Sequence, residues 1–197
     1  MKIFLSILLS LAFLFHHSET VSETRLHNYL LTEVDSVSHK TRPQINFPTP
    51  NVPKLFYVQR DPNTNTIIYD LNLNASGQPD SDNPIHPYWI KYNDRGQKEE
   101  LNFIQRKFAY GLITKPLGNN KFDVRFVSYK KYPLVLMRSA TDNKYHIYAT
   151  IEKKLAVLNR IFLKIEGGTF WFPNVVYVEI KGTDPDTGKE VTERFKP

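Results

Sequence analysis

The side chains best suited to chemistry gather in one stretch of the chain, residues 83–111. His86 is the candidate base within it, because an imidazole beside a carboxylate on a neighbouring strand can accept a proton, and Asp70 is a candidate for that carboxylate. A hydrolase that uses His86 with a nearby carboxylate is therefore one alternative. A lone histidine on a strand is more often structural, and we assign no catalytic residue and favour a non-enzymatic role.

The aromatic and cationic residues of the chain suit ligand binding better than catalysis. Small-ligand pockets combine apolar and aromatic walls with a few polar anchors. Arg160 stands in the middle of the apolar run 155–165, so its charge must be paired, exposed at an edge, or turned toward a cavity. The predicted ligand-binding set is Arg60, His86, Tyr88, Trp89, Arg106, Tyr110 and Arg160.

Other chemistries lack their sequence signatures. The chain has no cysteine, which excludes disulfides, thiolate zinc sites and a cysteine nucleophile. It has no nucleophile elbow, no glycine-rich phosphate loop and no pair of histidines on a helix. Residues 61–65 and 184–186 resemble the start of a calcium loop but lack its glycine and glutamate, so they are expected to be turns. We predict no metal site and no cofactor.

The charge of the chain argues against a nucleic-acid partner. The formal net charge is +6, from 26 Lys and Arg against 20 Asp and Glu, and the two signs are interleaved along the sequence. A nucleic-acid-binding protein needs a basic stripe on one face, and the sequence has no such block. We expect a solvated surface and no nucleic-acid binding.

The first 18 residues are predicted to be a signal peptide. Lys2 is followed by an apolar run at 3–15, which is too short to span the roughly 30 Å of a bilayer core. Cleavage is expected near residues 18–22, with an uncleaved anchor as the alternative. The prediction is export to a bacterial periplasm or envelope, or secretion.

The rest of the chain is predicted to form a proline-rich arm and one β-rich domain. Four prolines between 43 and 53 favour extended backbone, so 19–53 is interpreted as an arm or linker and 54–197 as the domain. Alternating apolar residues predict about nine strands, including hairpins at 55–73 and 176–195.

One amphipathic helix is predicted at 99–112. Leu101, Ile104, Phe108 and Leu112 recur at helical spacing, and Gly111 is expected to end the helix. The fold class is therefore mostly β (α+β), with a curled antiparallel or barrel-like sheet and the helix packed on it.

Four segments resemble an uncharacterised family of exported bacterial proteins, a domain of unknown function. These segments are 56–60, 65–69, 86–92 and 105–111, and the resemblance extends over roughly 55–180. It implies export to the cell envelope and offers no catalytic residues to carry over.

The function predicted from these observations is non-catalytic binding of a small apolar or amphiphilic ligand. A curled sheet capped by a helix encloses a concave apolar pocket, which is the default position for such a ligand. A structural or interaction role with another envelope protein is the alternative from a different class. The sequence does not indicate an oligomeric state.

Overall fold

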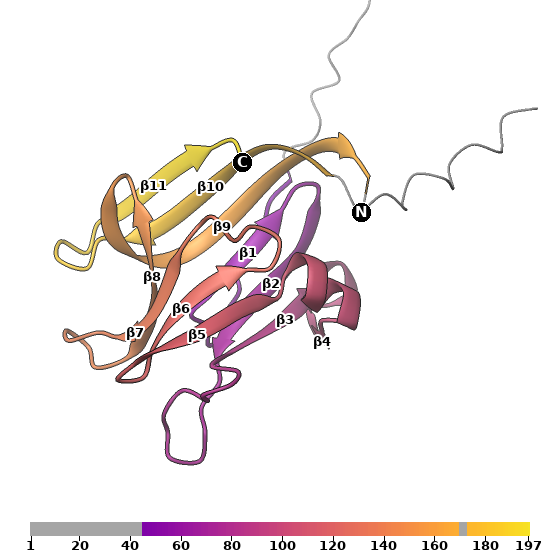
Figure 1. Ribbon diagram of the computed structural model, residues 1–197. Helices are drawn as coiled ribbons and strands as arrows, with labels where there is room; N and C mark the ends of the chain where they lie inside the picture. The colour runs from indigo at the N-terminus through magenta and orange to yellow at the C-terminus, as the bar shows by residue number, and fades with distance from the viewer. Residues whose placement is uncertain (1–44, 170–172) are drawn as a thin grey trace, which may run out of the picture. The chain divides into compact units, whose positions relative to one another are not determined.

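The computed structural model describes residues 45–169 and 173–197 (Figure 1). The predicted signal peptide, 1–18, and most of the predicted arm, 19–53, lie outside the described residues. No helix in the described part of the chain is long and apolar enough to cross a membrane.

The described residues form eleven strands and two short helical turns. The strands are β1 (Phe56–Arg60), β2 (Asn63–Leu71), β3 (Ile85–Lys91), β4 (Gln97–Glu100), β5 (Leu112–Gly118), β6 (Lys121–Phe126), β7 (Leu134–Arg138), β8 (Tyr145–Ile151), β9 (Lys154–Gly168), β10 (Pro173–Thr183) and β11 (Glu190–Phe195). The turns are the 3₁₀ turn η1 (Tyr92–Asp94) and the π turn η2 (Gln105–Ala109).

All eleven strands belong to one curled sheet. Nine follow a continuous path, β4-β3-β2-β1-β9-β8-β7-β6-β5, and the β10–β11 hairpin branches from β9 (Figure 1). The prediction of a mostly β, curled sheet is confirmed, and the sheet has the form of a half-barrel. The expectation of purely antiparallel pairing is wrong for one pair, because β1 runs parallel to β9.

The predicted amphipathic helix is wrong. Glu99 and Glu100, which we expected to begin it, belong to β4 and lie opposite Trp89 and Tyr88 of β3. What remains is the five-residue π turn, where the Tyr110 amide donates to the Gln105 carbonyl. Pairing with β3 overrides the helical periodicity, because it gives hydrogen-bond partners to the backbone N–H and C=O groups of β4. At the end of a helix some of these groups would have no partner.

Two side-chain hydrogen bonds fix where the π turn begins. The Gln105 amide donates to Asn102 Oδ1 at 2.9 Å, and the Asn102 amide donates to Gln105 Oε1 at 3.1 Å. At the other end a Cβ on Gly111 would lie 1.8 Å from the Arg106 carbonyl oxygen, so only glycine fits there. The chain is thus committed to a short turn rather than a helix that packs on the sheet.

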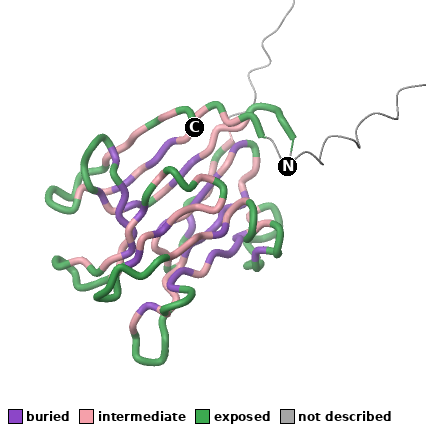
Figure 2. The backbone as a smooth tube through the Cα atoms, in the orientation of Figure 1, coloured by how far each residue is buried: buried purple, intermediate pink, exposed green. Residues whose placement is uncertain are grey.

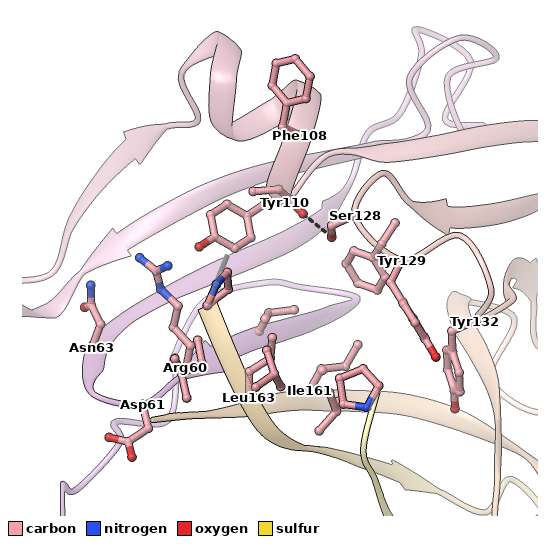
Figure 3. A pocket seen from close by; sticks show the side chains of 18 of the residues that line it. Arg60, Asp61, Asn63, Phe108, Tyr110, Ser128, Tyr129, Tyr132, Ile161 and Leu163 are labelled. Atoms are coloured by element: carbon pink, nitrogen blue, oxygen red, sulfur yellow. Dashed lines mark hydrogen bonds between the residues drawn. The ribbon is translucent and has the colours of Figure 1, made fainter. Parts of the chain in front are cut away.

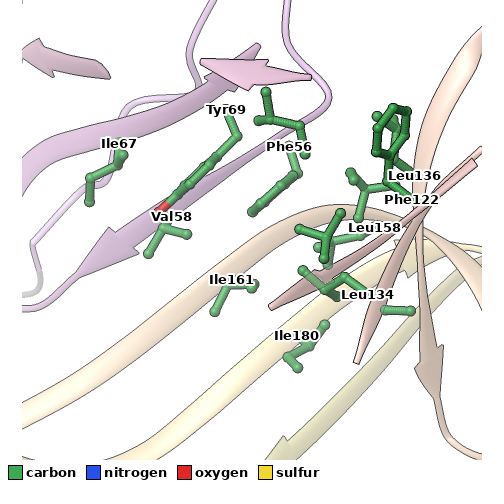
Figure 4. Close-up of a cluster of buried hydrophobic side chains, with 14 of the residues drawn as sticks. Phe56, Val58, Ile67, Tyr69, Phe122, Leu134, Leu136, Leu158, Ile161 and Ile180 are labelled. Atoms are coloured by element: carbon green, nitrogen blue, oxygen red, sulfur yellow. The ribbon is translucent and has the colours of Figure 1, made fainter. Parts of the chain in front are cut away.

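The larger hydrophobic core fills the concave face of the sheet (Figure 4). Phe56 and Val58 of β1 point into it, as do Ile67 and Tyr69 of β2, because alternate residues of a strand share a face. Phe56 and Tyr69 stack with ring centroids 4.4 Å apart, and Phe126 at the end of β6 meets both rings edge-on. These contacts hold the two arms of the half-barrel together.

A smaller cluster covers the opposite face. Ile68, Tyr88 and Ile90 are buried there, and Val52 packs against them. Phe47 meets Phe162 of β9 edge-on with ring centroids 5.1 Å apart. The segment 45–53 therefore contacts the convex side of the sheet, and side chains are buried on both faces of the central strands. Figure 2 shows the buried positions along these strands.

Candidate functional site

An apolar cleft of about 750 Å³ opens on the concave face of the sheet (Figure 3). Its volume falls in the range of small-molecule sites. The lining comes from β1, β2, β6, β9, β10 and β11, from the π turn and its flanking residues, and from the segment after β6. The lining residues are Val58, Arg60, Asp61, Pro62, Asn63, Tyr69, Ile104, Phe108, Ala109, Tyr110, Phe126, Ser128, Tyr129, Tyr132, Ile161, Leu163, Ile165, Gly167, Thr169, Pro173, Val175, Val178, Ile180, Phe195 and Pro197.

The floor of the cleft depends on an irregularity in β9. Leu158 and Ile161 both join the concave core although three positions separate them, because the register with β10 shifts between Lys181 and Gly182. After the shift Ile161 and Leu163 face the cleft. Arg160, immediately before Ile161, faces the other side of the sheet. The bulge thus determines which side chains of the apolar run meet a ligand.

One end of the cleft is aromatic. Tyr132 stacks on Phe195 with ring centroids 5.9 Å apart, and Tyr129 lies 6.4 Å from the same ring. The Tyr132 hydroxyl donates to the Thr150 carbonyl at 2.7 Å. Burial, with a smaller contribution from Glu193, raises the pKa of Tyr132 to about 12, so the phenol is neutral at physiological pH. This end offers apolar ring faces to a ligand.

Arg60 supplies a cation at another part of the lining. Its guanidinium carbon lies 5.6 Å from the centroid of the Trp89 ring and 5.5 Å from that of Tyr110. Its Nε is buried and has no hydrogen-bond partner, and within 45–169 and 173–197 no carboxylate pairs with Arg60. The neighbouring carboxylate, Asp61, is bonded instead to Lys164.

The pKa of the Tyr110 hydroxyl group depends on burial and on the charge of Arg60. Burial raises the pKa of Tyr110, and the positive charge of Arg60 opposes that shift. Tyr110 is also held in place through its backbone, because its carbonyl accepts a hydrogen bond from the buried Tyr69 hydroxyl at 2.8 Å. The aromatic wall beside Arg60 is therefore fixed by the core beneath it.

The structure brings together only part of the predicted ligand-binding set. Arg60 and Tyr110 line the cleft, and Trp89 lies directly behind them in the core with 2 % of its surface exposed. Tyr88 is buried in the smaller cluster on the opposite face.

Arg160 also faces away from the cleft and is paired. Its Nε donates to Gln59 Oε1 at 2.9 Å, and its Nη1 lies 3.8 Å from Glu179 Oε1. The guanidinium covers the Phe162 ring at 4.9 Å. Of the three alternatives that the sequence left open for this charge, the structure shows pairing.

His86 and Arg106 meet at a separate, solvent-exposed place. His86 Nε2 lies 2.7 Å from Glu100 Oε2, and Arg106 Nη2 lies 3.7 Å from the same oxygen. Asp70 sits opposite His86 in the register of β2 and β3. None of these four residues lines the cleft. In the described ranges no group of three or more His, Asp or Glu residues could hold a metal ion.

Sequence reasoning missed the aromatic end and most of the floor. Tyr129 and Tyr132 flank a lysine pair in a loop, which is an uncommon place for two aromatic rings and was the available signal. Leu163 and Ile165 lie in a run that is apolar on both faces, so the sequence did not show which face is a cavity.

Comparison with known proteins gives a family and no closer relative. No curated protein matches the chain, and no solved structure matches it. One family model, described as "Domain of unknown function (DUF4833)", matches residues 56–194. This confirms the predicted resemblance to a domain of unknown function and does not bear on export or on a bacterial source. By this match, which covers more than half of its length, the chain belongs to the DUF4833 family.

Proposed function

We propose that this protein binds an anionic amphiphile without transforming it. Arg60 holds the acidic head group, and the apolar tail lies along the cleft toward Tyr129 and Tyr132. The observation that carries the proposal is a guanidinium with no acidic partner among the described residues, set in the lining of an apolar cavity.

The electrostatics of Arg60 support an acidic head group. A buried polar donor without a partner is costly, and a ligand that supplies an acceptor removes that cost. The planar guanidinium fits carboxylate or phosphate oxygens in a bidentate arrangement. The rings of Trp89 and Tyr110, which meet edge-on, both pack against the group, so little side-chain freedom remains to be lost on binding.

The rest of the lining supports an apolar tail. Ile161, Leu163 and Val178 form a continuous apolar floor, and Tyr132 and Phe195 close it with stacked rings. Burying a methylene group there contributes about 0.8 kcal/mol, so affinity should rise with chain length until the cleft is filled.

The hydrolase alternative has less support. Among the described residues the cleft lining contains no histidine, and its one acidic side chain, Asp61, is bonded to Lys164. The Ser128 hydroxyl donates to the Ala109 carbonyl and has no base beside it. His86 and Glu100 lie outside the lining and are partly exposed, which gives them no water-excluding site for chemistry.

Export is part of the proposal and has its own test. The apolar run 3–15 after Lys2 supports removal of a signal peptide. N-terminal sequencing of the protein recovered from a secreting host should find a first residue near 18–22. Recovery with Met1 still in place would contradict cleavage.

Ligand binding is tested by displacement of the neutral probe 1-N-phenylnaphthylamine. Dodecanoate and dodecanol, which differ in the head group, should both displace it from the full chain. Arg60→Gln should weaken dodecanoate roughly tenfold, the loss expected for a charged hydrogen bond, and leave dodecanol unchanged. Arg138→Gln is the control, because Arg138 lies over Tyr145 and outside the cleft lining.

A second variant tests the place of the tail. Leu163→Trp fills the cleft and should weaken both ligands. If Arg60→Gln weakened the binding of dodecanoate and of dodecanol equally, Arg60 would not be the residue that binds the head group. Unchanged binding of both ligands to Leu163→Trp would place the amphiphile elsewhere.

A further inference from the structure

The segment 103–109, which holds the π turn and the two residues before it, exposes an unusual amount of apolar surface. Phe103 is 72 % exposed, Ile104 45 % and Phe108 54 %, although they stand within six consecutive residues. Single exposed hydrophobic residues are ordinary, but a contiguous group of large ones marks an interaction surface. Ile104 and Phe108 belong to the periodic set that predicted a buried helical stripe, and in the structure both are exposed.

Cations accompany these apolar side chains. Lys107 Nζ lies 5.3 Å from the centroid of the Phe103 ring and 5.5 Å from that of Phe108. In the described chain Lys107 has no carboxylate partner. Aromatic rings under a lysine are the combination found in segments that lie at the surface of a bilayer, where the ring enters the interface and the ammonium meets lipid phosphate.

The turn also borders the cleft. Ile104 and Phe108 belong to its lining, and Figure 3 shows Phe108 at the outer side of the cavity beyond Tyr110. Lys130 and Lys131 stand between the lining residues Tyr129 and Tyr132 and have no ion pair with any residue that the structure describes. Two segments at the cleft therefore carry unpaired positive charge.

We propose that the segment 103–109 docks on an anionic lipid bilayer, with Phe103 and Phe108 inserted among the lipid head groups. Charge complementarity selects this partner, because Lys107 is unpaired and the chain carries a formal net charge of +6. Arg106 keeps part of its charge free, since its contact with Glu100 is long at 3.7 Å and lies in solvent. Docking does not depend on whether the cleft holds a ligand.

The absence of cysteine makes a local test possible in the full chain. Phe103→Cys is labelled with the environment-sensitive fluorophore NBD and mixed with vesicles of equal parts phosphatidylcholine and phosphatidylglycerol. Insertion should shift the emission to the blue and raise its intensity. Leu117→Cys is the matched control, because Leu117 is 55 % exposed on β5 and lies outside both the turn and the cleft lining. Its label should not respond, even if residues 1–44 attach the chain to the vesicle.

Charge variants test the choice of lipid. Lys107→Gln should weaken the response at position 103 roughly fivefold, as expected for one cation at an anionic surface. Lys115→Gln, which removes an exposed lysine of β5, should leave it unchanged. The proposal is overturned if the label at 103 does not respond, if the label at 117 responds equally, or if pure phosphatidylcholine vesicles give the same response.

Discussion

Arg60 and Arg160 show how one residue type takes two roles on adjacent strands. β1 and β9 are parallel neighbours, and Tyr57 is the register partner of Arg160. Arg60 and Arg160 nevertheless face opposite sides of the sheet, because successive side chains of a strand alternate. Arg160 is satisfied by Gln59 and Glu179. The Arg60 guanidinium lies over the rings of Trp89 and Tyr110, and in the described chain no carboxylate pairs with it. Only Arg60 therefore has capacity left for a ligand.

Arg160→Ala should lower stability and leave ligand binding unchanged. The variant leaves the buried Gln59 carbonyl oxygen without its donor and removes one cation from Glu179, which keeps Arg194 at 2.6 Å. A hydrogen bond to a charged group contributes about 1.5–3 kcal/mol, so urea unfolding should show a loss near 2 kcal/mol. Arg138→Ala, at an exposed site, is the control.

The opposite result for Arg160→Ala would change the assignment of the site. Suppose that the unfolding free energy stayed the same while dodecanoate displaced phenylnaphthylamine less well. Arg160 would then belong to the binding surface, and Arg60 would not be the one arginine that binds the head group.

At the scale of elements, strand periodicity was a reliable guide where one face is buried. The runs that became β6 and β8 alternate between apolar and polar residues, and each forms the strand that this pattern predicts. The turn residues at 61–65 and 184–188 also marked real reversals, although residues 63–65 already belong to β2. Local chemistry decides these features, so they can be found from the sequence.

The helix at 99–112 could not be recognised as wrong from the sequence alone. Its apolar spacing fits a helix, but two distant partners decide its structure: β3 takes 97–100 as β4, and β6 takes 112–118 as β5. Only the segment between them is left for a turn. Strand pairing with residues outside the local window therefore overrides a helical period.

The candidate site was even less visible in the sequence. Val58 and Ile161 both line the cleft although they lie far apart in the sequence, and they are neighbours because β1 pairs with β9 as well as with β2. The shift in register between β9 and β10 then determines that Ile161 faces the cavity. Neither feature has a local sequence signal. Arg60, Trp89 and Tyr110 were nevertheless selected from residue type alone, and the structure brings these three together.

At the scale of the whole described unit, side-chain hydrogen bonds connect the loops at one end of the half-barrel. Gln78 Oε1, in the loop after β2, accepts hydrogen bonds from Asn120 Nδ2 at 2.8 Å and from the Tyr145 hydroxyl at 2.9 Å. These bonds join the β2–β3 loop to the β5–β6 turn and to β8. None of these three residues lines the cleft, so the hydrogen bonds that connect the loops leave the cavity accessible.

Buried tyrosines should make the protein unstable at high pH. Burial raises the pKa of Tyr69, Tyr110 and Tyr132 above the value of 10.0 expected in an unfolded chain. Above pH 10 the unfolded state therefore loses phenol protons that the folded state retains. The unfolding free energy then falls as pH rises, and for Tyr132 the fall continues to about pH 12.

Tyr132→Phe separates this effect from the titration of lysines in the same pH range. The variant has no phenol at position 132 to ionise, so its unfolding free energy should fall less steeply than that of the unmodified chain between pH 10 and pH 12. The difference should reach about 1 kcal/mol, after a discount for the partial exposure of this ring. At pH 8 the variant should instead be the less stable protein, because it lacks the hydrogen bond to Thr150. Urea unfolding followed across this range tests both signs, and parallel curves for the two proteins would show that Tyr132 ionises as freely in the fold as in the unfolded chain.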